Sequence, residues 1–67
     1  MNTTINGEQR QFNANQLPLP QLLEELGLSG HPVVVEHNGT ALLPAEHSEA
    51  VISDGDRLEI VRVVAGG

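Results

Sequence analysis

The stretch Leu58-Glu59-Ile60-Val61-Arg62-Val63-Val64-Ala65-Gly66-Gly67 ends the chain and decides how the rest of it is interpreted. Its β-branched and aliphatic residues, from about Arg57 to Val64, predict a strand. Side chains alternate between the two faces of a strand, so Leu58 and Ile60 share one face. We expect that face to join the core and the strand to lead directly into the final glycines.

The two terminal glycines, Gly66 and Gly67, contribute little to a globular domain. Glycine adds no buried side chain and loses the most backbone entropy when it is ordered. At average glycine usage, two terminal glycines arise by chance in roughly 0.5% of chains. A chain end that must enter a narrow channel in another protein benefits from the missing Cβ atoms. The ending therefore indicates, weakly by itself, a C-terminal carboxylate presented to a partner.

Length and composition limit the classes of function. The chain has 67 residues, no cysteine, and a net charge of −6 from nine acids and three arginines. This length predicts one domain with a small core, and the acidic balance argues against binding nucleic acid or an anionic membrane. Neither a run of roughly 18 apolar residues nor a signal peptide is visible. We therefore expect a cytoplasmic protein.

Turn and helix signals place the first elements. The Asn6-Gly7 pair fits a type I′ turn between strands near residues 2–6 and 9–13, with Ile5 and Phe12 facing inward. A helix follows, in which leucines recur at helical spacing, and Gly27 is suited to the left-handed position after the helix C-terminus. The leucines are Leu19, Leu22, Leu23 and Leu26.

Two further segments complete a sheet. Residues 32–36 contain a run of valines that predicts an interior strand. Turns are expected at Asn38-Gly39 and Asp54-Gly55-Asp56, with a loop or a single helical turn at residues 44–48. One helix packed on one face of such a sheet gives an α+β fold. The first and last strands would pair in parallel, which would carry the C-terminus beyond the sheet.

No side-chain cluster in the sequence indicates catalysis. The histidines His31, His37 and His47 match no compact metal-ligand spacing, and Asp54 and Asp56 fit a turn better than an acid–base pair. We expect a protein that is not an enzyme and holds no metal. The terminal carboxylate remains, because a partner could adenylate it and a sulfur nucleophile could then displace AMP.

The outer face of the last strand is a candidate contact surface. Val61 and Val63 fall on the face opposite Leu58, where they could give a partner an apolar grip. Packing beneath a neighbouring loop explains them equally well.

The sequence resembles the ThiS family, the ubiquitin-like sulfur carriers of thiamine thiazole synthesis. The resemblance covers nearly the whole chain. The matching segments are Ile5-Asn6-Gly7-Glu8, Leu22-Leu23-Glu24-Glu25-Leu26-Gly27-Leu28, Pro44, Asp54-Gly55-Asp56 and Ile60 to Gly67. It implies a β-grasp fold: a mixed sheet of four to five strands packed by one main helix. It divides the chain into a domain at residues 1–64 and a flexible tail at residues 65–67.

The resemblance also implies a mechanism. Gly67 would be adenylated with ATP and converted to a thiocarboxylate, with Gly66 and Ala65 as its slim approach and no bound cofactor. The implied partners are a ThiF-like adenylating enzyme related to ubiquitin-activating enzymes, a ThiG-like thiazole synthase, and a cysteine desulfurase or related sulfur donor. Arg62 would join Val61 and Val63 in contacting them.

Two alternatives stay open. The chain could carry sulfur for another pathway, as the small subunit of molybdopterin synthase does, or for cysteine synthesis or tRNA thiolation. It could instead be a ubiquitin-like interaction module that binds a partner without chemistry at its end.

Overall fold

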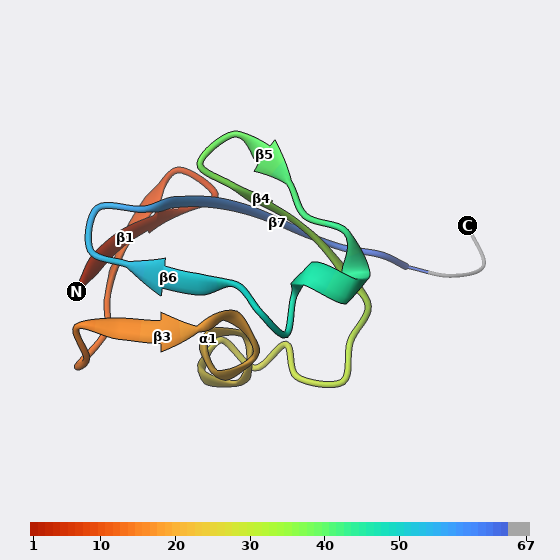
Figure 1. Cartoon of the computed structure of the whole chain (residues 1–67), viewed down its shortest axis with the longest axis horizontal. Helices are drawn as coiled ribbons and strands as arrows, with labels where there is room; N and C mark the ends of the chain where they lie inside the picture. Colours follow the sequence, from red (N-terminus) through yellow and green to blue (C-terminus); the bar gives the residue numbers. More distant parts are fainter. Residues whose placement is uncertain (65–67) are drawn as a thin grey trace.

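A mixed sheet with one helix across a single face makes up most of the chain in the computed structural model, which describes residues 1–64 (Figure 1). The five-stranded sheet has the order β2-β1-β7-β4-β5, and β3 pairs with β6 in a second, two-stranded sheet. The elements are β1 (Asn2–Ile5), β2 (Glu8–Gln11), β3 (Gln16–Pro18), α1 (Leu19–Glu25), β4 (Val33–His37), β5 (Thr40–Ala41), the 3₁₀ turn η1 (Pro44–Glu46), β6 (Val51–Ser53) and β7 (Arg57–Arg62).

Both predicted Asn-Gly turns are confirmed. Asn6 and Gly7 have φ of 52° and 81°, and Asn38 and Gly39 have φ of 51° and 85°. Positive φ at both central residues defines the type I′ turn, whose twist matches that of the two strands it joins. The two hairpins, β1–β2 and β4–β5, therefore follow from local sequence chemistry.

Helix α1 begins without a polar side-chain cap. Pro18 occupies the N-cap position and Pro20 lies in the first turn, where a missing N–H leaves no bond unmade. The backbone N–H of Leu19 donates instead to the carbonyl of Ala50 at 2.9 Å. A neighbouring segment thus replaces the capping residue that the sequence lacks.

The helix ends as the glycine predicts. Gly27 has φ of 76°, its N–H donates to the carbonyl of Glu24 at 3.0 Å, and the N–H of Leu28 donates to that of Leu23 at 2.8 Å. This pair of bonds is the Schellman motif, in which a left-handed glycine turns the chain back over the helix end.

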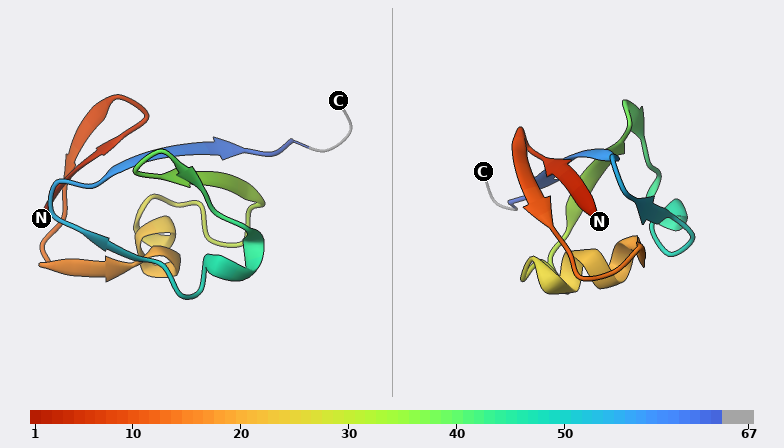
Figure 2. Two further views of the ribbon diagram at one scale, coloured as in Figure 1. Left: turned by 45° about the horizontal axis from the view of Figure 1, so that its top comes forward. Right: turned by 90° about the vertical axis from the view of Figure 1, so that its left-hand side faces the viewer.

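The core lies between α1 and the sheet, with β3 and β6 closing one side (Figure 2). Leucines of the helix pack against inward-facing residues of five strands of the two sheets and against Phe12. The buried apolar residues are Ile5, Phe12, Leu17, Leu19, Leu22, Leu23, Val35, Ile52, Leu58 and Ile60. The exposure of Val34 shows that only one face of the large sheet is covered. Its side chain is 50% exposed, whereas those of its neighbours Val33 and Val35 are half-buried and buried.

Strand β7 runs parallel to β1, as expected, and continues past it. The parallel register joins Thr4 to Arg57 and Ile5 to Leu58, whereas β4 accompanies β7 antiparallel from His37 to Val33. The far end of β7 consequently has a sheet neighbour on one side only. Within residues 1–64, no helix is long and apolar enough to cross a membrane.

Three predicted details are wrong. The last strand ends at Arg62, not near Val64, and the valine strand starts at Val33, not Pro32. Both differences come from Pro32: its carbonyl accepts the N–H of Val63 at 2.9 Å, but proline has no N–H to return. The second strand ends at Gln11, not at residue 13, and the small β3–β6 sheet was not predicted.

The arrangement is the ubiquitin-like β-grasp expected from the resemblance. It combines a mixed sheet, a parallel pairing of the first and last strands, and one helix across the inner face. This topology carries β7 out at the end of the molecule opposite the N-terminus (Figure 1).

Candidate functional site

The predicted reactive end, Gly67, lies outside the described residues, as do Gly66 and Ala65. The structure follows the chain to Val64, which is 78% exposed. The predictions of a flexible tail and of chemistry at Gly67 therefore remain predictions. What the structure describes is the part of the domain from which these residues continue.

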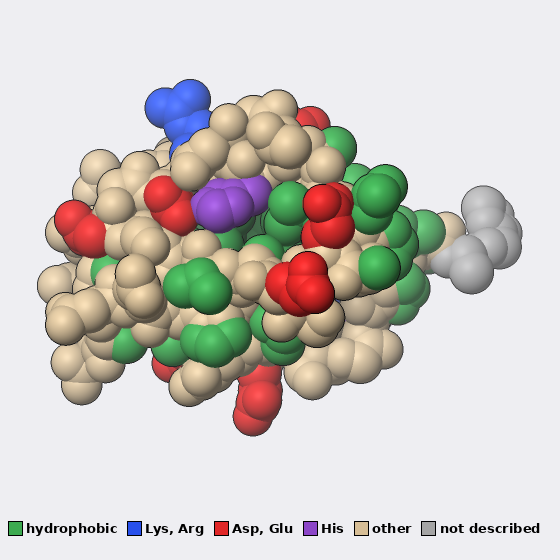
Figure 3. Space-filling model, in the orientation of Figure 1, with side chains coloured by type: hydrophobic (Ala, Val, Ile, Leu, Met, Phe, Trp, Pro, Cys, Tyr) green, Lys and Arg blue, Asp and Glu red, His purple; other side chains and the backbone are tan. Residues whose placement is uncertain are grey.

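Val61 in β7 and Val63 just after its end lie on the outer face, away from the helix, with 62% and 46% of their surface exposed. Packing beneath a loop does not account for them. Val61 lies directly opposite Val34 on β4, and the two side chains share the outer face. Hydrophobic side chains also gather on the surface at the end of the molecule where β7 finishes (right side of Figure 3).

Leu43 extends this apolar surface. Glu36 pairs with Ala41, and the N–H of Leu42 donates to the carbonyl of Val35 at 2.9 Å, so the β4–β5 register continues. Continued by one residue, this register places Leu43 opposite Val34 on the outer face, where Leu43 is 67% exposed. We name Val34, Leu43, Val61 and Val63 the outer patch.

Sequence reasoning found only half of the outer patch. Val34 was hidden in a continuous valine run that carried no alternation, and Leu43 follows a two-residue strand. The signal that could have found them is register, because pairing across the Asn38-Gly39 turn places Val34 and Leu43 at one level.

Arg62, the third residue predicted to contact a partner, is separated from the two valines. It has the parity of Leu58 and Ile60 and therefore projects toward the helix side. Its Nη2 lies 3.0 Å from Nδ1 of His31, in the loop after the helix. A partner that contacts Val61 and Val63 across the outer face would not reach Arg62 from the same side.

Asn6 fixes the direction of β7 where β1 ends. Its Nδ2 donates to the carbonyl of Ile60 at 3.0 Å, and its Oδ1 accepts the N–H of Ile60 at 2.7 Å. The side-chain amide thereby copies the two hydrogen bonds that another strand residue would make. The same asparagine adopts the left-handed conformation of the turn. Asn6 therefore ends strand β1 through its backbone and continues the hydrogen bonding of β7 through its side chain.

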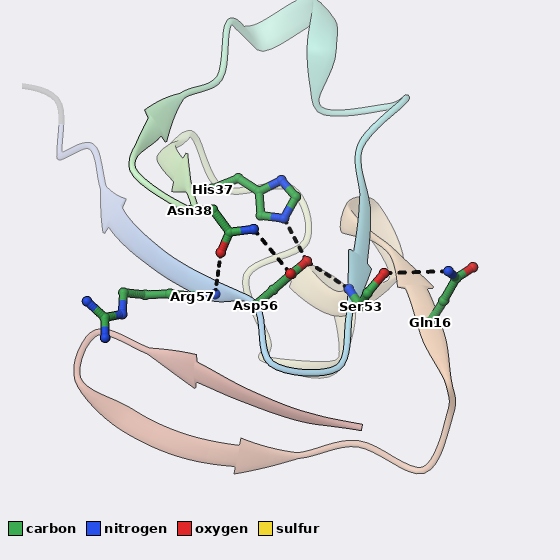
Figure 4. Close-up of polar contacts among 6 residues, drawn as sticks. All are labelled: Gln16, His37, Asn38, Ser53, Asp56 and Arg57. Carbon is green, nitrogen blue, oxygen red and sulfur yellow. Dashed lines mark hydrogen bonds and ion pairs between the residues drawn. The ribbon is translucent and has the colours of Figure 1, made fainter.

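The acid and histidine that the sequence raised as possible catalytic or metal residues form a structural network (Figure 4). Oδ2 of Asp56 lies 2.7 Å from His37 Nε2 and accepts the N–H of Ser53 at 2.9 Å, while Oδ1 accepts from Asn38 Nδ2 at 3.1 Å. Asn38 Oδ1 accepts the N–H of Arg57 at 2.8 Å. The network ties the turn before β7 to the β4–β5 turn.

The surroundings of Asp56 keep its carboxylate charged. Burial by itself would raise the pKa of Asp56, but hydrogen bonds from His37, Ser53 and Asn38 and the nearby His37 charge outweigh it, and the pKa lies below its ordinary value. Asp54 accepts the N–H of Asn2 at 2.7 Å. Both aspartates thus hold strands together, and residues 1–64 contain no group of three potential metal ligands.

Comparison with known proteins gives one family. The sequence profile of the ThiS family matches residues 3–67. A thiazole synthase of Paramagnetospirillum magneticum (strain ATCC 700264 / AMB-1) is 39% identical over 67 residues, which are 100% of this chain and 20% of that protein. The chain therefore spans about a fifth of the length of this curated relative.

Solved structures give the same answer. The crystal structure of a thiamine biosynthesis protein (ThiS) from Geobacter metallireducens has a TM-score of 0.85 and 32% identity, with 100% of both chains covered. A solution NMR structure of a thiamine biosynthesis protein from the same organism has a TM-score of 0.80 at 32% identity, covering 100% of this chain and 88% of the other. The chain belongs to the ThiS family, because the family profile matches almost its entire length.

Proposed function

We propose that this ThiS-family chain is a sulfur carrier of thiamine biosynthesis, which acts as a co-substrate of partner enzymes rather than as an enzyme. The carboxylate of Gly67 would be the group that carries the sulfur. The observation that supports this most directly is that the family match continues through Gly66 and Gly67. The similar structures from Geobacter metallireducens are thiamine biosynthesis proteins, which favours this pathway over the other carrier pathways.

The proposed chemistry has two steps, adenylation at the α-phosphorus of ATP and sulfur transfer at the Gly67 carbonyl carbon. The Gly67 carboxylate attacks the α-phosphate of ATP, pyrophosphate leaves, and an acyl-adenylate forms. The terminal sulfur of a persulfide on a cysteine desulfurase or related donor then attacks the carbonyl carbon and AMP leaves, which gives an acyl disulfide. A thiol reductant cleaves the S–S bond of this disulfide and releases the thiocarboxylate. The chain has no cysteine, so its own side chains offer no thiol for the sulfur. We expect both steps to occur in the cytoplasm.

Thiazole synthase is the proposed acceptor of the sulfur. A polypeptide named thiazole synthase contains, in a fifth of its length, a stretch 39% identical to this chain. Placing a carrier and an enzyme in one chain raises the local concentration of each for the other. This supports a ThiG-like enzyme as a partner, and the chemistry of the first step requires a ThiF-like adenylating enzyme as another.

The outer patch is the surface that we propose the adenylating enzyme contacts. Its four aliphatic side chains are between 46% and 67% exposed and adjoin the end of β7. Contact with an enzyme would remove this apolar surface from water, which favours association. The net charge of −6 would further favour an enzyme surface that is basic around the contact.

The test is an intact-mass measurement. The chain, incubated with a ThiF-like enzyme, ATP and a sulfur donor, should gain the mass difference of one oxygen exchanged for sulfur. A chain lacking Gly67 should gain nothing while keeping the circular dichroism spectrum of the full chain. Restoration of thiamine synthesis by the truncated chain in a deficient strain would show that the carrier proposal is wrong and would favour a non-covalent module.

A further inference from the structure

One edge of β7 is open for hydrogen bonding near its end. The N–H of Val63 donates to the carbonyl of Pro32, so the polar groups of Val63 point toward β4. Those of Ile60 point the other way, to Asn6. The backbone N–H and C=O groups of successive residues point alternately to the two edges of a strand. The backbone groups of Arg62 therefore lie on the edge that Asn6 occupies at Ile60.

Arg62 has no backbone partner on this edge. Strand β1 ends at Ile5, and the Asn6 amide reaches only Ile60. On the other edge of β7, Arg62 faces Val33 of β4. This is a non-hydrogen-bonded pair of the antiparallel ladder, as is the Val35–Ile60 pair two residues earlier. Within residues 1–64, the backbone hydrogen bonds outside the strand pairings include none to Arg62. An unpaired strand edge is a template for another strand.

A hollow of about 270 Å³ lies beside this open edge, on the helix side of β7. Leu26 and Leu28 supply apolar walls, and Arg10 and Arg62 flank it. Two of the three arginines of an otherwise acidic chain thus line one small hollow, and the Arg62 guanidinium also lies 3.0 Å from His31 Nδ1. Alternate side chains of an added strand would point to the helix side, into this space.

We propose that the adenylating enzyme adds an extended segment to the open edge of β7 at Arg62, and that an acidic side chain of this segment enters the hollow between Arg10 and Arg62. The proposal rests on the proposed function. Before activation, Gly67 carries no chemical mark, so an enzyme must recognise the chain through groups that precede the glycines. Main-chain pairing supplies register, and the hollow supplies side-chain selectivity.

Charge favours the enzyme over a second copy as the occupant. Two copies of a chain with net charge −6 repel each other. The adenylating enzyme must in any case hold the segment next to Gly66 and Gly67. An acidic side chain between two guanidinium groups gains charge-assisted hydrogen bonds that a neutral side chain would not make.

The first test separates the N–H of Arg62 from its side chain. Arg62→Ala keeps the N–H, and Arg62→Pro removes it at an edge position where proline is tolerated. We expect KM for thiocarboxylate formation to rise roughly fivefold more in Arg62→Pro than in Arg62→Ala, which is the worth of one hydrogen bond. Equal KM values in two folded variants would overturn the proposal.

The second test uses matched charge reversals. Arg10→Glu and Arg57→Glu change the net charge equally, but only Arg10 borders the hollow. We expect Arg10→Glu to raise KM about tenfold, since an attraction becomes a repulsion, and Arg57→Glu to leave KM within about twofold. Similar effects of both changes would mean that only net charge matters, against the proposal.

Amide exchange of the wild-type chain gives a readout that does not depend on a variant folding. The N–H of Arg62 should exchange faster than those of Ile60 and Val63 in the free chain, and at least tenfold more slowly when the enzyme is saturating. Unchanged exchange in a complex that forms thiocarboxylate overturns the edge proposal alone. Absence of any thiocarboxylate in the wild-type chain overturns the proposed function instead. Protection of Arg62 through self-association would identify a second copy as the occupant, which also overturns the proposal.

Discussion

Replacing Val61 by serine should weaken recognition by the adenylating enzyme and leave the fold intact. Full burial of a valine side chain is worth about 2 kcal/mol. Val61 is 62% exposed in the free chain, so an enzyme that covers it gains roughly 1.2 kcal/mol from this residue. A loss of that size corresponds to a rise in KM of about fivefold to tenfold, with kcat unchanged. The assay is the initial rate of thiocarboxylate formation by intact mass, at several concentrations of the carrier.

The control is Val51→Ser. Val51 is 47% exposed, also on a strand, but it belongs to β6 in the small sheet and not to the outer patch. It should leave KM within about twofold of the wild-type value, since the enzyme would not cover it. The reasoning is refuted if Val61→Ser leaves KM unchanged, or if Val51→Ser raises it as much. Thermal unfolding followed by circular dichroism should confirm that both variants are folded, since neither valine is buried.

Predictions for four further substitutions concern stability, measured by urea unfolding with circular dichroism. Asp56→Ala should lower the free energy of unfolding by about 2–3 kcal/mol, because the Ser53 amide and the His37 and Asn38 side chains lose a charged acceptor; a loss below about 0.5 kcal/mol would contradict this. Because the pKa of Asp56 is lower in the folded than in the unfolded chain, its charged form stabilises the fold. This stabilisation is fully present above the unfolded pKa and is lost as pH falls through the folded pKa. Stability should therefore fall less steeply in Asp56→Asn than in the wild-type chain on the acid side of about pH 4. Gly27→Ala should lower the free energy of unfolding by about 1 kcal/mol, because alanine at φ of 76° is strained. Leu22→Ala, in a fully buried position, should lower it by about 2–5 kcal/mol. A larger loss for Gly27→Ala than for Leu22→Ala would contradict both assignments.

The sequence predicted those elements whose cause is local. The turn at Asn6-Gly7 needs two left-handed residues side by side, and Asn-Gly supplies them. The end of the helix needs a glycine with positive φ, and Gly27 is that residue. The buried stripe of the helix follows from the spacing of Leu19, Leu22 and Leu23 alone.

The unpredicted elements depend on partners distant in sequence. Strands β3 and β6 have three residues each, and Leu17 pairs with Ile52 across the chain. So short a segment shows no periodicity, and a proline at the end of β3 argues against a strand. The cap of the helix was missed for the same reason, because the acceptor for Leu19 is the backbone of Ala50.

The candidate site was predicted in part, and the structure separates Arg62 from the two valines. Sequence proximity grouped Arg62 with Val61 and Val63, but adjacent residues of a strand lie on opposite faces. The outer patch gained Val34 and Leu43 only once the pairing of β4 with its two neighbours was known. A contact surface on a sheet is set by register, which a single sequence specifies only weakly.

The two edges of β7 end their pairing within a few residues of each other, for unrelated chemical reasons. On one edge, β1 gives way to the side chain of Asn6, which makes the last pair of bonds at Ile60. On the other edge, Pro32 accepts from Val63 but has no N–H to return. The domain therefore holds β7 firmly through Ile60, partly at Val63, and leaves Val64 largely exposed. Within residues 1–64, an asparagine on one edge and a proline on the other therefore set where the sheet pairing of β7 ends.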